Sequence, residues 1–235
     1  MKIDIWSDYV CPFCYIGKRR IEEAIKRTGF EKTTDLDFKA FQLDPDAPAV
    51  SGETVREGLA KKYGMSEEEV RKMTDNTTDL AKSTDLHFDY DAMVTVNTFD
   101  AHRLSKWAAI RRKRKEFDEY VFKSYFTEGR KIGVEEVLVS MADEIGLPKY
   151  EAEKVLRSDQ FKEEVLEDIR QAKQLGINSV PYYVINGKYS ISGAQPVEVF
   201  EEALRKVAEE EGLTPVLEPI VESEPDGACN TKQSG

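Results

Sequence analysis

The opening of the chain restricts its fold most, because a strand, a helix and a second strand follow one another within about 43 residues. Alternating apolar residues in Lys2–Ser7 and Asp35–Leu43 predict two strands, and the spacing of apolar residues from 14 to 28 predicts a helix that ends near Gly29. Such a unit is expected to be right-handed, with parallel strands. The sequence therefore predicts an α/β structure built around a sheet.

Two cysteines three positions apart, Cys11 and Cys14, lie between the first predicted strand and the first predicted helix. At a helix start, unpaired backbone N–H groups and the positive end of the helix dipole favour a thiolate, and the pKa of a C-x-x-C cysteine can fall well below the free value of about 8.5. The position also matches the sheet edge where open α/β folds place their chemistry. We interpret the pair as a redox dithiol in which Cys11 reacts first and Cys14, expected to be more buried, reacts second.

Two other uses of the cysteine pair are weaker. A structural zinc site normally has four ligands, and the sequence adds only Cys229, His87 and His102, none of them in a paired motif. A static disulfide between these positions would be strained at a helix start, and few such bonds persist in the cytosol. No metal is therefore expected.

The charge balance limits the possible partners. With 34 basic and 45 acidic residues the net charge is −11, which argues against nucleic acid or an anionic membrane surface. The one basic run, Arg111–Lys115, is expected at a solvated helix face or a helix junction. Neither a signal-peptide pattern after Met1 nor a membrane-spanning apolar run is present in the sequence. We therefore expect a cytoplasmic monomer or homodimer.

From the turn at 44–48 to about Leu175 the patterns are almost only helical. Capping signals predict helix starts at Ser66, Asn97 and Ser158, and a helix stop at Gly176. Residues 51–165 are therefore predicted to form an all-helical insertion domain.

The sheet pattern returns after the helical block. Ile177–Ile185 and Lys188–Ile191 are rich in strand-forming residues, and the Asn186-Gly187 pair between them predicts a tight hairpin. A helix from Pro196 to about Glu211 follows. This order predicts a thioredoxin fold with a central mixed sheet, formed by residues 1–50 and 166–212.

Residues 213–235 change in composition, because prolines alternate with acidic residues and few apolar residues remain. The sequence predicts an acidic, flexible C-terminal tail. The tail contains Cys229, for which two readings stay open: an idle exposed thiol, or a third thiol that reaches the dithiol or crosslinks two chains.

Four matches in one order carry a family resemblance: Cys11-Pro12-Phe13-Cys14, Asn97–Leu104, Ser179-Val180-Pro181 and Ser192–Pro196. Over about residues 1 to 212, the chain resembles DsbA-family thioredoxin-fold disulfide oxidoreductases of the FrnE-like branch. The sequence itself leaves the isomer of the Val180–Pro181 bond open, and an ordinary trans proline at a strand start is the alternative.

The resemblance implies a cis Pro181 beside the dithiol and a Val180 backbone that pairs with an extended substrate segment. It further implies substrate contacts at Pro12 and Phe13, of which Phe13 tunes the redox poise, and a helical insertion that forms one wall of the substrate groove. His102 is a candidate substrate contact, with a helix-face or core histidine as the alternative.

The reaction expected is thiol–disulfide exchange with protein or peptide disulfides and dithiols, without metal or organic cofactor, although small thiols such as glutathione or a partner dithiol can exchange with the pair. The direction, whether oxidation, reduction or isomerisation, is left open. One rival is a glutathione-linked isomerase or transferase of the 2-hydroxychromene-2-carboxylate isomerase or kappa-class type, which typically carries serine at the position of Cys11. The other is a non-catalytic peptide-binding or chaperone-like module.

Overall fold

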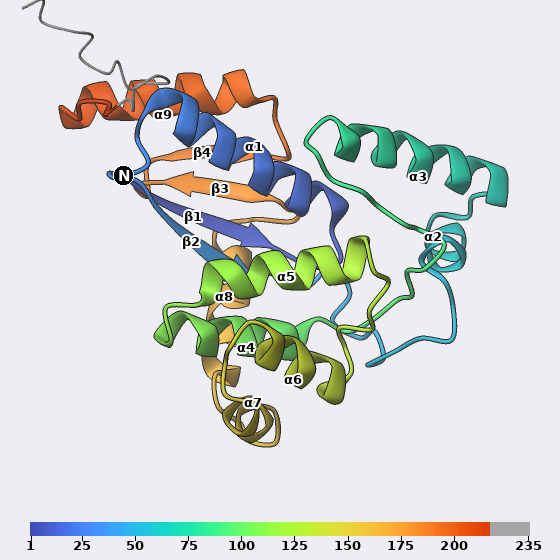
Figure 1. Ribbon diagram of the computed structural model, residues 1–235. Helices are drawn as coiled ribbons and strands as arrows, with labels where there is room; N and C mark the ends of the chain where they lie inside the picture. The colour runs from blue at the N-terminus through green and yellow to red at the C-terminus, as the bar shows by residue number, and fades with distance from the viewer. Residues whose placement is uncertain (217–235) are drawn as a thin grey trace, which may run out of the picture.

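The computed structural model describes residues 1–216, and Cys229 and most of the predicted tail lie outside this range. Within it, four strands form one mixed sheet in the order β2-β1-β3-β4 (Figure 1). Their bounds are β1 (Lys2–Ser7), β2 (Asp35–Ala40), β3 (Tyr182–Ile185) and β4 (Tyr189–Ser192). The pairing of β1 with β2 is parallel, and the pairings of β1 with β3 and of β3 with β4 are antiparallel. The predicted thioredoxin fold with a mixed sheet is confirmed.

The hairpin between β3 and β4 forms as its sequence predicts. Asn186 and Gly187 have φ angles of 50° and 67°, the left-handed pair that a tight two-residue hairpin requires. The third strand, however, begins at Tyr182 and not at Ile177, because Pro181 has no N–H to donate to a strand ladder.

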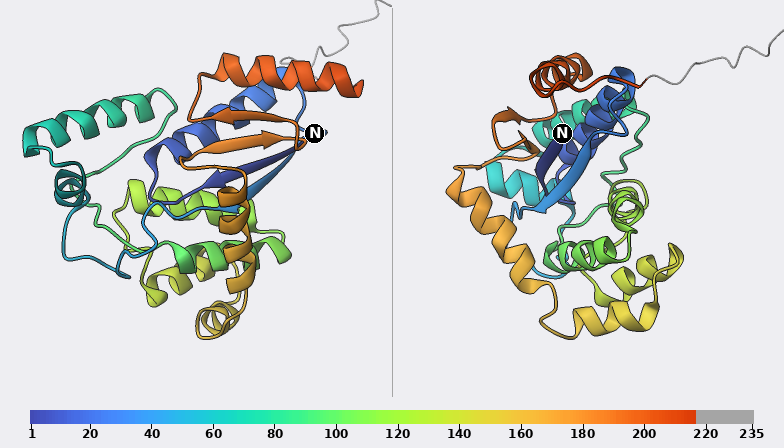
Figure 2. Two further views of the ribbon diagram at one scale, coloured as in Figure 1. Left: turned by 180° about the vertical axis from the view of Figure 1, so that it is seen from behind. Right: turned by 90° about the vertical axis from the view of Figure 1, so that its left-hand side faces the viewer.

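The described chain forms its helices in the following order: α1 (Pro12–Thr28), α2 (Val55–Tyr63), α3 (Glu67–Lys82), α4 (Phe99–Ile110), α5 (Arg114–Phe126), α6 (Glu135–Glu144), α7 (Lys149–Leu156), α8 (Lys162–Gln174) and α9 (Val197–Glu211). Helices α1 and α9 pack together on one face of the sheet, while α8 crosses behind β1 and β2 (Figure 2). Helices α4 to α7 gather beside β2, and α2 and α3 extend away from the sheet (Figure 1). No helix within residues 1–216 has the length and apolarity needed to cross a membrane.

Two hydrophobic clusters hold these layers together. One, between the sheet and helices α1 and α9, contains Ile3, Ile5 and Phe200. The other fills the helical block and continues through Tyr15 to both cysteines of the dithiol. The dithiol therefore lies where the helical block meets the sheet. Helix α8 crosses position 166, and the division into a thioredoxin-like domain and an insertion domain stays a prediction.

The capping predictions have mixed outcomes. The predicted start of α3 is confirmed, since Ser66 and Glu69 form a reciprocal capping box. At α4 the N-cap position is Thr98, but Asn97 Oδ1 still accepts the Phe99 N–H at 2.9 Å. The predicted start of α8 at Ser158 is wrong, because the chain first passes through a left-handed residue, Phe161 with φ 59°, and the helix begins at Lys162.

The predicted junction in the basic run is confirmed. Arg111 ends α4, Arg112 adopts a left-handed conformation with φ 57°, and Lys113 precedes α5. The bounds of helix α2 were not predicted from the sequence. None of its residues is buried, so the helix lacks a clear apolar face whose periodicity would have identified it.

Candidate functional site

The predicted dithiol lies at the carboxyl end of β1 and the start of α1. Cys11 is the N-cap residue of α1 and Pro12 follows at the first helical position, where a missing N–H costs little. The Cys11 N–H donates to the Asp8 carbonyl at 3.1 Å, which fixes the turn between strand and helix. The first turn of α1 contains no acidic side chain, so no carboxylate competes for the positive end of the helix dipole.

Both cysteines are free thiols and both are buried, with 4% of Cys11 and 1% of Cys14 exposed. Cys14 is the more buried of the two, as predicted, but the difference is small. Phe13 between them is 43% exposed and presents an apolar surface beside Cys11. A partner that approaches the dithiol therefore meets Phe13 before it meets either sulfur.

The surroundings of Cys14 favour its neutral form. Burial raises the pKa of the Cys14 thiol well above its usual range, and hydrogen bonding and charge repulsion from Cys11 add to the effect. The Ser7 hydroxyl and the Asp8 backbone act in the opposite direction. Ser7 and Asp8 are themselves buried, so they are the polar groups that can stabilise a charge on Cys14. Sequence analysis missed both, because nothing in the local pattern shows that they face Cys14.

The segment before β3 closes the site from the opposite side. The Val180–Pro181 peptide bond is cis, in agreement with the resemblance. The Cys11 Sγ atom lies 3.5 Å from the Val180 carbonyl oxygen, to which the thiol donates. The Pro181 carbonyl accepts the Gly193 N–H at 2.8 Å, which ties the turn after β4 to this segment. The structure thus brings together Cys11, Cys14, Val180 and Pro181, although Cys11 and Val180 are 169 residues apart in the chain.

Gly17, which sequence analysis did not single out, sets how closely this segment approaches α1. A Cβ atom at Gly17 would lie 2.3 Å from the Tyr183 hydroxyl oxygen and 3.1 Å from Pro181 Cγ. Tyr183 is fully buried, and its hydroxyl has no hydrogen-bond partner within the described residues. Burial raises the pKa of Tyr183 well above its usual range, because a charged phenolate would lose its hydration there. Only glycine leaves room at this position for β3 and Pro181 to pack beneath the dithiol.

Replacing Gly17 by alanine should therefore destabilise the protein by about 1–3 kcal/mol, because the added methyl group overpacks a rigid site. Helix propensity alone favours alanine by about 1 kcal/mol, so a loss of stability identifies the steric contact as its cause. The midpoint of urea unfolding measures the change. Gly52→Ala is the control, because its Cβ atom meets nothing within 4 Å. Equal or higher stability of Gly17→Ala would contradict the prediction.

His102 lies in the core and is 6% exposed. Its Nε2 atom is 3.1 Å from the Phe41 carbonyl oxygen and 3.5 Å from Asp8 Oδ1, and its ring packs 4.7 Å from the Tyr9 ring. His102 therefore occupies the core position that the sequence allowed as the alternative. Its ring has almost no exposed surface with which to contact a substrate. His102 instead links the segments that follow β1 and β2.

Within residues 1–216, no group of three His, Cys, Asp or Glu side chains is arranged so that it could hold a metal ion. The polar groups around the dithiol are instead hydroxyl, carboxylate and backbone groups, which act on a sulfur through hydrogen bonds and charge.

Comparison with known proteins agrees with this geometry. The family model of the DSBA-like thioredoxin domain matches residues 2–205. A solved structure of a probable DsbA oxidoreductase from Streptomyces coelicolor is 33% identical, with 97% of each chain covered and a TM-score of 0.84. The uncharacterized protein YwbO of Bacillus subtilis is 28% identical over 205 residues, which cover 86% of this chain and 94% of the relative.

A solved 2-hydroxychromene-2-carboxylate isomerase is also similar, with 15% identity, a TM-score of 0.68 and coverage of 90% of this chain and 98% of the other. At this identity the likeness shows a common fold. The family model and the 33% identical structure both span most of the chain. The chain belongs to the DSBA-like thioredoxin domain family.

Proposed function

We propose that the protein is a thiol–disulfide oxidoreductase that exchanges with disulfides and dithiols of proteins or peptides through Cys11 and Cys14. The observation that carries this proposal is the placement of two free thiols at the start of α1, with Cys11 Sγ 3.5 Å from the Val180 carbonyl oxygen. Membership in the DSBA-like family supports the reaction class.

The reaction begins when the Cys11 thiolate attacks one sulfur of a substrate disulfide. A Cys11–substrate disulfide forms, and the other substrate sulfur leaves as a thiolate, which takes up a proton. Cys14 then loses its proton and attacks the Cys11 sulfur. This second step forms the Cys11–Cys14 disulfide and releases the substrate as a dithiol. In this direction, glutathione or a partner dithiol reduces the Cys11–Cys14 disulfide back to two thiols. Read in reverse, the same two steps oxidise a substrate dithiol and leave the pair reduced, and a partner disulfide such as oxidised glutathione restores the Cys11–Cys14 disulfide.

The buried surroundings of Cys14 fit the second role. Because burial raises the pKa of the Cys14 thiol and so favours its neutral form, Cys14 is the poorer nucleophile of the two for the first attack. The Ser7 hydroxyl and the Asp8 backbone are positioned to stabilise the thiolate that forms when Cys14 attacks. Both residues act on Cys14 and not on the substrate.

Substrate binding is assigned to the surface around Cys11. An extended segment of the substrate pairs with the Val180 backbone, and Pro181 sets the direction of that backbone. Phe13 and Pro12 supply apolar contact beside the reacting sulfur, and the exposure of Phe13 supports this role. The glutathione-linked isomerases and transferases are less well supported, because the chain has a dithiol where they typically have a serine.

The dithiol is expected to reach redox equilibrium with glutathione, and alkylation followed by mass measurement gives the fraction oxidised at each glutathione ratio. A potential near the cytosolic glutathione poise of about −220 to −260 mV favours reduction or isomerisation, and one near about −120 mV favours disulfide donation. If no Cys11–Cys14 disulfide forms at any ratio, and no peptide disulfide is turned over, the proposed function is wrong.

A further inference from the structure

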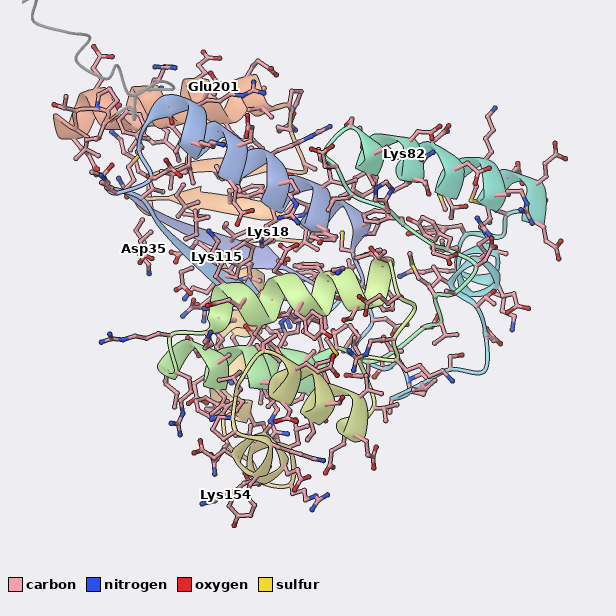
Figure 3. All side chains as sticks on the ribbon, in the orientation of Figure 1. Lys18, Asp35, Lys82, Lys115, Lys154 and Glu201 are labelled. Atoms are coloured by element: carbon pink, nitrogen blue, oxygen red, sulfur yellow. The ribbon has the colours of Figure 1, made fainter. Side chains whose placement is uncertain are left out.

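A cleft of about 740 Å³ lies apart from the dithiol, between α1, the outer edge of β2 and the junction of α4 and α5. None of residues 7–17 and 177–194 lines this β2-edge cleft. Figure 3 labels Lys18 on α1, Asp35 at the start of β2 and Lys115 on α5, which come from its three sides. The apolar part of its lining consists of Ile25, Leu36, Phe38 and Ala109. A ligand in the cleft therefore meets apolar side chains between charged walls.

One side of the cleft is an edge strand whose backbone is only partly paired. The Asp35 N–H donates to Met1 and the Phe41 N–H to Ser7, so the odd-numbered residues of β2 face β1 and the backbone of Leu36, Phe38 and Ala40 faces outward. Two of the outward groups, the Phe38 C=O and the Ala40 N–H, are occupied by side chains. The Leu36 N–H and C=O and the Phe38 N–H have no partner within residues 1–216.

The occupied groups lie at the carboxyl end of β2. The Phe38 carbonyl accepts a hydrogen bond from the Arg114 guanidinium, and the Ala40 N–H donates to Asp168 Oδ2 at 2.9 Å. These side chains end the open edge after Phe38. A strand added to β2 would therefore pair with Leu36 and with the Phe38 N–H, inside the cleft.

Unpaired positive charge on the α4–α5 wall favours an acidic ligand. Among the cations of the lining, Lys18 pairs with Glu22 and Glu119, Arg19 pairs with the same two carboxylates, and Arg114 pairs with Asp37. Lys26, Arg112 and Lys115 have no ion pair within the described chain, and all three are exposed.

The unpaired carboxylates of the lining lie elsewhere. Glu31 and Asp35 have no ion pair either, but they lie before and at the start of β2, and the charge of Asp35 acts on Lys2. On the opposite wall the carboxylate of the lining, Asp118, is buried and pairs with Arg114, so Arg112 and Lys115 face no unpaired carboxylate there.

We propose that the β2-edge cleft binds an extended acidic segment of a partner polypeptide, which adds a strand to the outer edge of β2. Alternate side chains of the segment pack on Leu36 and Phe38, and its carboxylates pair with Arg112 and Lys115. The binding needs neither cysteine, so this site acts independently of the proposed exchange reaction.

A short fluorescein-labelled peptide in which glutamate alternates with valine tests the proposal, with fluorescence anisotropy of the full chain as the measurement. The double variant Arg112→Glu/Lys115→Glu should weaken binding about tenfold or more. Lys113→Glu is the matched control, since Lys113 pairs with Glu116 and does not line the cleft. Equal binding by the double variant, or equal binding of a peptide with lysine in place of glutamate, overturns the proposal.

Backbone methylation of the peptide tests strand addition. N-methylation of one alternating set of peptide amides should abolish binding, and methylation of the other set should preserve it, because only one set faces β2. Equal effects of the two sets contradict an added strand. Cys11→Ser should bind the peptide as the unaltered chain does, so a failed exchange assay and a failed binding assay remain distinguishable.

A variant truncated after Val216 tests whether the cleft is occupied by a partner or by the C-terminal residues of the same chain. Unchanged peptide binding supports an external partner. Markedly tighter binding after this truncation would instead assign the cleft to residues 217–235 of the same chain, and would overturn the proposal of a partner polypeptide.

Discussion

Replacing Cys11 by serine should lower the rate of disulfide exchange by about a thousandfold or more, because a serine hydroxyl cannot form the mixed disulfide. Cys14→Ser should have a different effect. Cys11 can still attack, but nothing resolves the product, so a Cys11–substrate disulfide accumulates. Intact-mass measurement after incubation with a peptide disulfide distinguishes the two variants, since only Cys14→Ser should gain the mass of the peptide.

The third cysteine provides the control for these variants. Cys229→Ser should keep the exchange rate if Cys229 is an idle thiol, and a large loss would instead identify it as an active third thiol. Unchanged exchange in Cys11→Ser would refute the assigned nucleophile. If peptide binding persists in the variant lacking both Cys11 and Cys14, while the unaltered chain shows no turnover, the non-catalytic binding module is the better reading.

Asp168→Ala should destabilise the fold by about 3–5 kcal/mol, the usual result of removing one partner of a buried ion pair. Asp168 is 3% exposed and forms an ion pair with Lys106. Its Oδ2 atom also accepts the Ala40 N–H, and its carbonyl accepts the Trp6 indole N–H at 2.9 Å. Burial already lowers the pKa of Lys106 despite this partner. Without Asp168, the half-buried Lys106 ammonium loses its closest counter-charge, and the Ala40 N–H loses its acceptor.

Urea unfolding measures this loss, and two variants define its cause. Glu167→Ala removes an exposed neighbour that pairs with Arg170 on the same helix, and should change stability by less than about 0.5 kcal/mol. Asp168→Leu combined with Lys106→Met removes both charges, and should recover much of the stability lost in Asp168→Ala. A small effect of Asp168→Ala would mean that this ion pair is not a major anchor between α8, α4 and β2.

The parts of the fold that sequence analysis predicted depend on neighbours in the chain. The dithiol needs only a strand, a turn and a helix in succession, and the Asn186-Gly187 hairpin needs only two left-handed residues. The predicted start of α8 was wrong. Ser158 is a residue type favoured at helix N-caps, but the left-handed backbone at Phe161 postpones the start of the helix to Lys162. Here the path of the chain between α7 and α8 determines where α8 begins.

The missed residues depend on contacts between distant segments. Gly17 looks like an ordinary helix residue until Tyr183 and Pro181 are placed against it. Ser7 and Asp8 gain a role only because the turn before α1 brings them under Cys14. Asp168 is one of many acidic residues of the chain, and only the packing of α8 on β2 makes it the partner of a backbone amide. No periodicity in the sequence records such contacts.

The strand order has a consequence for synthesis on the ribosome. Strand β1 lies inside the sheet, yet its antiparallel neighbour β3 begins about 175 residues after β1 ends. At about 5–20 residues per second, the emerging chain waits roughly 10 to 35 s before β3 has been made. During that interval one edge of β1 is unprotected and Cys11 lacks its Val180 neighbour. The nascent protein therefore carries a bare thiol on an unfinished sheet, and translation itself sets the earliest moment at which the dithiol is enclosed.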